Sequence, residues 1–382
     1  MSDYQEKFDH WYTENSTFWG FGEVIDKQSF NLIPLETLLH LDKNNLKPSA
    51  KDTLEYILSD SSSQELKMGF WAFSQFQDIL EISLDDKSPM FNRHYCYYES
   101  LVYLHESIIS WLDQNSLAAI TLIRPFLESA ILHLYWYLRC KDSNYKSYYL
   151  WFDGKKEKPP FHDQLNFIFD SLPPKDFLSK KRTLLIKDLI IKAYKAACAY
   201  NHVPKIDESI IGITGGMDRN SIHGFYFYLA NINMTLRQII YLYTLVYPLS
   251  LFPIDRYKKW GFSGPVGLFF DERNYSILED YLGVENITKI KISISDYKYI
   301  ETLLSWCNNF PDITQKEIEK SWEEFLENKP NIKENNPEQR KSMYLAEIHA
   351  LGWFTNYIHE PFNENEISDE QLEKMKKYMN NW

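Results

Sequence analysis

Residues 117–140 read LAAITLIRPFLESAILHLYWYLRC, and this stretch decides the fold. It is apolar on nearly every side of a helix and is interrupted internally by Arg124, Glu128 and His133. A helix that is apolar all round lies at the centre of its domain. Because a bilayer span tolerates few charges, the three polar residues indicate the central helix of a soluble protein that makes no membrane contact.

Helical periodicity extends on both sides of this stretch. Apolar residues recur at helical spacing in five further segments, 65–82, 92–112, 163–171, 182–200 and 218–247. We therefore expect a mainly α protein whose core is a helical bundle formed by residues 91–250. Residues 1–90 are expected to form an N-terminal helical segment.

The pattern changes after residue 250. Gly and Pro cluster at 260–267, and Ile290, Ile292 and Ile294 alternate with polar neighbours. Such alternation is typical of a half-buried strand, so short strands are predicted at 266–270 and 288–295. Residues 251–382 are therefore expected to form a small C-terminal α+β region. Its helices are predicted at 296–307, 314–327, 338–359 and 368–380.

Composition narrows the classes of function. The chain has 382 residues, 44% of them hydrophobic, and a net charge of −12. This balance indicates a globular protein and argues against general nucleic-acid binding, because phosphate contacts require Lys and Arg. Residues 154–205 differ, since eleven Lys and Arg face five Asp and Glu there. This basic region is either a solvated surface or a patch that contacts a phosphate-rich partner such as RNA.

The cysteines and the N-terminus indicate a cytoplasmic protein. The four cysteines are scattered without a CxxC pair, which is typical of free thiols in a reducing compartment. Residues 1–8 are polar and acidic, so no signal peptide is expected. His residues lack the spacing of metal ligands, and no phosphate-loop motif is found, so neither a metal nor a cofactor is expected.

Arg124 and Glu128 form the first candidate site. They are four residues apart, so they share one strip of an otherwise apolar helix. Charges buried without partners would be very costly, so we expect both to be substantially buried and to contact polar groups of another helix. One interpretation is a structural pair that orients the helix. The other is a binding cleft in which Arg124 holds an anion and Glu128 orients it.

A second polar cluster lies at the start of the predicted 218–247 helix. Arg219 and His223 are four residues apart and share a face in its first turns. A helix N-terminus favours anions, so this pair is a candidate to hold and protonate a phosphate. Asn201 and His202 come just after the preceding helix and are candidates to approach the same place. The alternative is an ordinary capping region in which His223 makes a tertiary hydrogen bond.

These features resemble the HEPN superfamily of small helical domains over about residues 92–250. The resemblance rests on two long helices, one with an internal Arg–x–x–x–Glu and a later one that opens with an Arg/Asn/His element. The segment 123–128, IRPFLE, is similar to uncharacterised bacterial families attached to that superfamily. HEPN ribonucleases typically separate their Arg and His by a longer gap than the three residues between Arg219 and His223. The resemblance implies a bacterial anti-phage or toxin–antitoxin context.

Three functions are compatible with the sequence. The first is a non-catalytic helical interaction or sensor protein of an anti-phage defence system, which binds a ligand or a partner protein. The second is a metal-independent, HEPN-like endoribonuclease. In it His223 would be the general base toward a ribose 2′-hydroxyl, and Arg219 or Arg124 would stabilise the phosphorane charge. The third is a purely structural polar core.

A homodimer is also expected. By resemblance, HEPN-like domains dimerise through their long helices. The predicted 218–247 helix carries more aromatic residues than one core face normally needs, and Tyr is favoured at interfaces. These aromatic residues are Phe225, Tyr226, Phe227, Tyr228, Tyr241, Tyr243 and Tyr247. The alternative is that the C-terminal region covers them within one chain.

Overall fold

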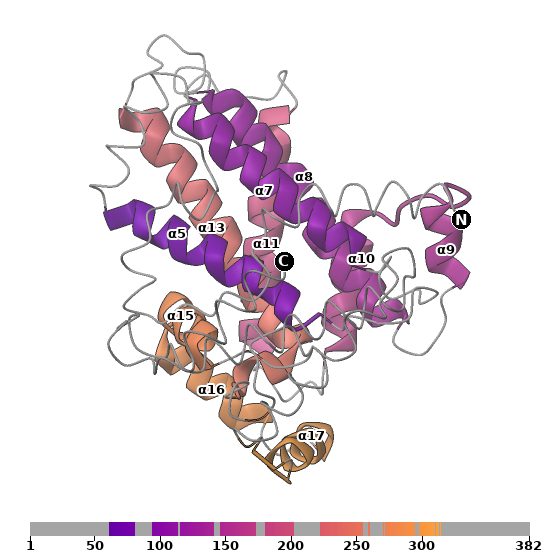
Figure 1. Cartoon of the computed structure of the whole chain (residues 1–382). Coiled ribbons are helices and arrows are strands. Elements are labelled where there is room, and N and C mark those ends of the chain that lie inside the picture. Colours follow the sequence, from indigo (N-terminus) through magenta and orange to yellow (C-terminus); the bar gives the residue numbers. More distant parts are fainter. Residues whose placement is uncertain are drawn as a thin grey trace, which may run out of the picture.

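A computed structural model describes the chain over a series of segments (Figure 1). These are residues 61–80, 94–113, 115–140, 146–172, 180–201, 222–254, 272–294 and 298–309, with residues 259, 270, 311, 312 and 314. All of the secondary-structure elements assigned within these residues are helices, which confirms the mainly α prediction. None of these helices combines the length and the continuous apolar surface that a bilayer span demands.

The core is built on a helical hairpin formed by α7 (Tyr95–Leu112) and α8 (Ser116–Cys140). The two helices are antiparallel: Ser107 Oγ donates to the Ala119 carbonyl at 2.7 Å, and Ser129 Oγ donates to Glu99 Oε2 at 2.9 Å. α8 also packs against α10 (Phe161–Ser171), α11 (Lys180–Asn201) and α13 (Ile222–Val246). Contact on so many sides explains why α8 is apolar nearly all round, and it confirms the prediction that this helix is central.

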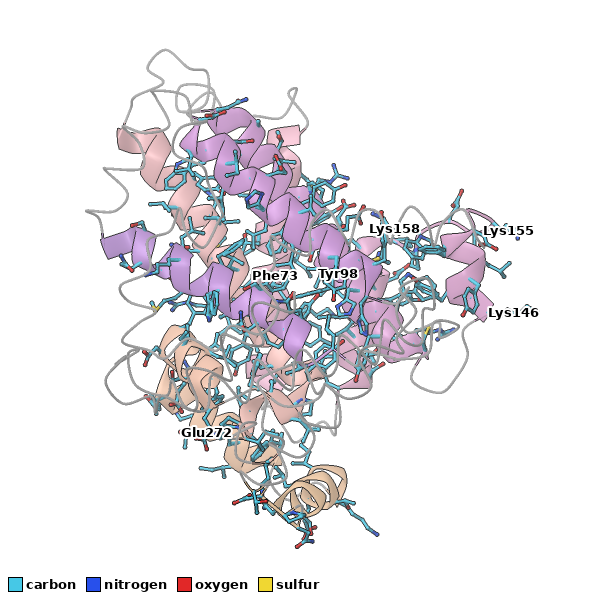
Figure 2. The ribbon with its side chains drawn as sticks, viewed as in Figure 1. Phe73, Tyr98, Lys146, Lys155, Lys158 and Glu272 are labelled. Carbon is cyan, nitrogen blue, oxygen red and sulfur yellow. The ribbon has the colours of Figure 1, made fainter. Side chains whose placement is uncertain are left out.

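α13 and α5 (Ser61–Ser74) complete the core (Figure 1). The Tyr243 ring of α13 lies 5.2 Å, centroid to centroid, from Phe73 of α5 (labelled in Figure 2) and 5.1 Å from Phe76 of η1 (Gln75–Asp78). Near the other end of α13, the buried Tyr228 stacks on Trp111 at 5.0 Å. The aromatic residues of α13 therefore join three other elements within one chain.

This packing corrects the sequence argument for a homodimer. Tyr228, Tyr241, Tyr243 and Tyr247 are all buried in the single chain, with at most 9% of each residue exposed. They therefore offer no aromatic surplus to a second copy. The side chains of residues 225–227 lie outside the described part of the chain. The rings of Tyr228, Tyr243 and Tyr247 pack against Trp111, Phe73 and Tyr137, which all belong to the helices of the bundle.

The strand predicted at 288–295 is wrong, because α16 (Val284–Ile294) is a helix. Ile287, Ile290 and Ile294 are almost completely buried, whereas Ile292 is 68% exposed. Buried residues at spacings of three and four lie on one helical face, and this face packs against the core. Ile290 and Ile294 belong to the buried helical face, and the exposed Ile292 lies between them. The three isoleucines therefore look like an alternating strand pattern although the segment is a helix.

The remaining elements complete the chain order. α9 (Lys146–Phe152) lies between α8 and α10, where its buried Tyr148 packs with Trp136 of α8, and η3 (Pro248–Leu251), α15 (Glu272–Leu282) and α17 (Lys298–Asn309) lie after α13. The segment predicted as helical at 65–82 corresponds to α5, which begins at Ser61, and to η1. Of the strand predicted at 266–270, only Phe270 is described, and its carbonyl accepts from Ile254 N–H at 3.0 Å. The helices predicted at 314–327, 338–359 and 368–380 lie outside the described residues, apart from Thr314.

Candidate functional site

The Arg124–Glu128 pair forms on α8 as its spacing predicts. Arg124 Nε donates to Glu128 Oε1 at 2.8 Å. The side chains are 30% and 19% exposed, respectively, so the pair lies at the edge of the bundle instead of being substantially buried. The expectation that both side chains are substantially buried is therefore wrong, because this strip of α8 stays partly exposed. Water and small solutes can therefore reach the pair.

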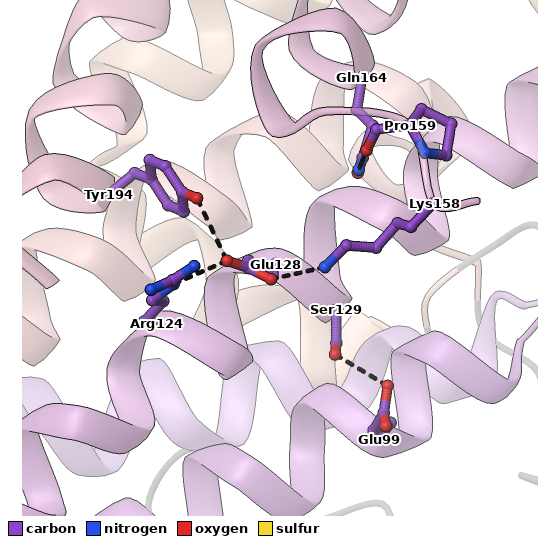
Figure 3. Close-up of polar contacts among 8 residues, drawn as sticks. All are labelled: Glu99, Arg124, Glu128, Ser129, Lys158, Pro159, Gln164 and Tyr194. Atoms are coloured by element: carbon purple, nitrogen blue, oxygen red, sulfur yellow. Dashed lines mark hydrogen bonds and ion pairs between the residues drawn. The ribbon is translucent and has the colours of Figure 1, made fainter. Parts of the chain in front are cut away.

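Glu128 collects two further donors from other elements (Figure 3). Lys158 Nζ, from the segment between α9 and α10, donates to Glu128 Oε2 at 2.6 Å. The hydroxyl of Tyr194, from α11, donates to Glu128 Oε1 at 3.2 Å. The expectation of polar partners from another helix is therefore confirmed for Glu128. We refer to Arg124, Glu128, Lys158 and Tyr194 as the Glu128 cluster.

Packing around the Glu128 cluster holds its donors in place. The Tyr194 ring stacks on Phe161, with ring centroids 3.9 Å apart and an interplanar angle of 10°. The residue after Lys158 is Pro159, whose carbonyl accepts from Gln164 Nε2 at 2.6 Å. Gln164 is 1% exposed, so this bond anchors the 157–160 segment to the buried face of α10. The cluster thus joins α8, α10 and α11.

The electrostatics of the cluster favour an ionised Glu128. Burial alone would raise the pKa of Glu128, but hydrogen bonds from Lys158 and Arg124 outweigh burial and hold this pKa below its ordinary value. The hydrogen bond to Glu128 in turn raises the pKa of Arg124. Burial, with the nearby Cys198 and Glu128, raises the pKa of Tyr194 to about 12. At neutral pH the cluster therefore holds two cations, one carboxylate and one protonated hydroxyl.

Glu99 is a second carboxylate beside the cluster, and it behaves in the opposite way. It accepts from Ser129, the neighbour of Glu128 on α8, and no Arg or Lys lies within ion-pair distance of it among the described residues. Burial raises the pKa of Glu99, although hydrogen bonds and the more distant charge of Lys158 oppose the rise. Lys158 therefore stabilises both carboxylates but contacts only Glu128.

A separate polar cluster lies in the middle of the core. His94 Nδ1 lies 3.0 Å from His133 Nε2, and His133 Nδ1 lies 2.9 Å from the Tyr243 hydroxyl. The Tyr243 hydroxyl donates to the Ala130 carbonyl at 3.2 Å, so it accepts from His133 Nδ1–H. His133 Nε2 then accepts from His94 Nδ1–H. This order assigns the Nδ1–H tautomer to both imidazoles and links α7, α8 and α13.

The His94–His133–Tyr243 chain was missed in the sequence. His133 is fully buried and His94 is 4% exposed, so these imidazoles are not accessible to a substrate. Their hydrogen bonds serve to join helices of the core. The available signal was a single imidazole inside the apolar 117–140 run. A polar side chain in such a helix requires a partner, but the sequence does not identify which one.

Most of the predicted second cluster lies outside the described residues. Arg219 and His202 are not described, and for Asn201 and His223 only the helical backbone is, at the end of α11 and the start of α13. Whether these four approach Arg124 and Glu128 therefore stays a prediction. Within the basic region 154–205, Lys155 pairs with Asp153 at 3.0 Å and Lys158 pairs with Glu128. Both lysines are thus partly neutralised.

The described part of the chain contains no group of three His, Cys, Asp or Glu residues that could hold a metal ion.

Comparison of the chain with protein-family models, with curated proteins and with solved structures finds no match. The chemistry of the Glu128 cluster is therefore the basis on which a function can be argued.

Proposed function

We propose that this protein is a non-catalytic helical interaction or sensor protein of the HEPN-like kind, acting in a bacterial anti-phage defence system. The observation that carries the proposal is that three donors bind the carboxylate of Glu128. Its carboxylate accepts from Arg124, Lys158 and Tyr194 at once and so ties α8 to α11 and to the 157–160 segment. Such an arrangement suits recognition and signalling through helix packing. The defence context comes from the resemblance of 123–128 and the two long helices.

The same cluster is poorly suited to RNA cleavage. A phosphorane needs uncompensated positive charge, but Glu128 neutralises part of the charge of Arg124 and Lys158 and would repel a phosphate. A general base works best with a pKa near the operating pH. Glu128, with its lowered pKa, is a weak base, and Tyr194, with a pKa of about 12, stays protonated. These properties favour a binding role for the Glu128 cluster over a role as a ribonuclease site.

Incubation of the purified full chain with labelled total RNA in EDTA tests the proposal. We expect the RNA to remain intact, both with the wild-type protein and with His223→Ala. Cleavage that persists in EDTA and disappears in His223→Ala would contradict the proposal and support the metal-independent ribonuclease with Arg219 and His223 as its catalytic pair. Arg124→Ala would then separate a contribution of the Glu128 cluster from that of the second cluster.

A homodimer remains part of the proposal through the resemblance alone. HEPN-like domains tend to assemble through their long helices. Since the later tyrosines of α13 are buried within one chain, the first turns of α13 are the part of this helix that we propose for the dimer interface. Light scattering at micromolar concentration should then give twice the chain mass of 45.6 kDa. A mass of one chain across that range would remove the dimer and leave the monomeric binding protein.

A further inference from the structure

The donors around Glu128 are held by contacts in which Glu128 takes no part. The Tyr194 ring is fixed by its stack on Phe161, and the backbone next to Lys158 is fixed by the Gln164 bond to the Pro159 carbonyl. Arg124 stands on the central helix, and its guanidinium carbon lies 5.9 Å from the centroid of the Tyr194 ring. Removing the Glu128 side chain would therefore leave three donors that still point at one place.

The cluster also carries a surplus of positive charge and is open to small solutes. Within the Glu128 cluster, the two cations Arg124 and Lys158 face one ionised carboxylate. Lys158 is 42% exposed and Arg124 is 30% exposed. Carboxylate and phosphate oxygens accept the same charge-assisted hydrogen bonds from Arg and Lys, so Glu128 has the chemistry of an internal substitute for either.

We propose that Arg124, Lys158 and Tyr194 form a preorganised oxyanion site, which Glu128 fills in the free protein and which an anionic group of a ligand fills when Glu128 turns away. The inference rests on the proposed binding function and deepens it, because it names the chemistry that the protein recognises. Exchange of one carboxylate for an outside anion would release α8 from the Glu128 contacts to α11 and the 157–160 segment. Ligand binding would in this way change how α8 packs against α11 and the 157–160 segment.

The test uses thermal unfolding of the full chain with inorganic phosphate, with acetate, or with chloride at the same ionic strength. Glu128→Ala opens the volume of the carboxylate, whereas Glu128→Gln removes its charge but keeps its volume. At a tenfold excess over Kd, phosphate or acetate should raise the Tm of Glu128→Ala by about 2 °C above chloride. Glu128→Gln and the double variant Arg124→Gln/Glu128→Ala should match their chloride controls. If Glu128→Ala does not fold, Glu128→Ser serves in the same series.

The wild-type protein completes the experiment. Because Glu128 competes with the added anion, it should respond to the same anion only at about tenfold or higher concentration. A larger effect of phosphate identifies a phosphate-bearing ligand, and an effect of acetate alone identifies a carboxylate of a partner; either supports the site. The proposal is overturned if no anion exceeds chloride in Glu128→Ala or its substitute Glu128→Ser, if the double variant responds equally, or if the wild-type protein never responds.

This result can be separated from a failure of the proposed function. Cleavage of RNA in EDTA would defeat the non-catalytic role whatever the anion data show. Intact RNA without any anion-specific change in Tm would leave the interaction protein standing and remove only the oxyanion site. In that case Glu128 would be a permanent structural partner of Arg124, Lys158 and Tyr194.

Discussion

Gly69→Ala provides a sharp test of how closely α5 and α15 approach each other. A Cβ atom at Gly69 would lie 2.7 Å from Tyr281 Oη, 2.9 Å from its Cζ and 3.1 Å from its Cε2. Tyr281 is 2% exposed, its hydroxyl donates to the Asn233 carbonyl at 3.4 Å, and Arg237 lies 5.5 Å over its ring. A rigid, buried ring cannot give way as a flexible chain end would, so the added methyl overpacks this contact.

Two effects of opposite sign decide the magnitude. Ala in place of Gly in a helix interior gains about 1 kcal/mol, whereas overpacking of a core typically costs about 1–3 kcal/mol. The two ranges leave an expected net loss of up to about 2 kcal/mol in the free energy of unfolding. With an unfolding entropy of about 2.1 cal/mol/K per residue, this loss lowers Tm by up to about 3 °C.

Urea unfolding of the single and double variants measures the effect. Tyr281→Leu removes all three ring atoms that the methyl would meet, so Gly69→Ala should become neutral or stabilising in that background. The coupling free energy between the two sites is expected to exceed about 1 kcal/mol. A Gly69→Ala protein that is more stable than the wild type, with no coupling to Tyr281, would refute the close approach.

Two other predictions concern the core. Ile290→Asp should lower the free energy of unfolding by about 3 kcal/mol or more because Ile290 is buried. Ile292→Asp, at an exposed position, should change it by less than about 0.5 kcal/mol. Equal losses in urea unfolding would contradict the buried helical face of α16. His133→Phe should lower the free energy of unfolding by about 2–4 kcal/mol, because it deprives His94 of its acceptor and Tyr243 of its donor inside the core. A His133→Phe protein with unchanged stability would show that these hydrogen bonds do not hold the three helices together.

Local periodicity was enough to predict most of the bundle. The predicted segments 92–112, 163–171 and 182–200 each lie within about two or three residues of α7, α10 and α11, because each has a clear apolar face. Periodicity failed at 288–295, where a run of isoleucines satisfied the strand period and the helical period together. It gave no signal for α9, whose seven residues are too few to display a face.

The candidate site could be predicted only in part. The spacing of Arg124 and Glu128 on one helix predicted their contact, because neighbours on a helix surface are set by sequence alone. Lys158 and Tyr194 could not be predicted, since they reach Glu128 only through the packing of α11 and the 157–160 segment. The depth of the pair was also misjudged, because the apolar residues around it in sequence cover other faces of α8.

The most direct test of the account is a titration of Glu128 and Glu99 followed by NMR of ¹³C-labelled carboxyl groups, with Glu128→Gln and Glu99→Gln for assignment. Glu128 should titrate below the ordinary glutamate pKa of about 4.3, and Glu99 above it. A lowered pKa means that Glu128 stabilises the fold above about pH 4.3 and that this contribution is lost as the pH falls through its folded pKa. The raised pKa of Glu99 has the opposite sign, so its contribution is full below about pH 4.3 and is lost as the pH rises through its folded pKa. Accordingly, at neutral pH Glu128→Gln should lower the free energy of unfolding and Glu99→Gln should not. A Glu128 pKa at or above that of Glu99 would contradict a carboxylate held by Arg124, Lys158 and Tyr194.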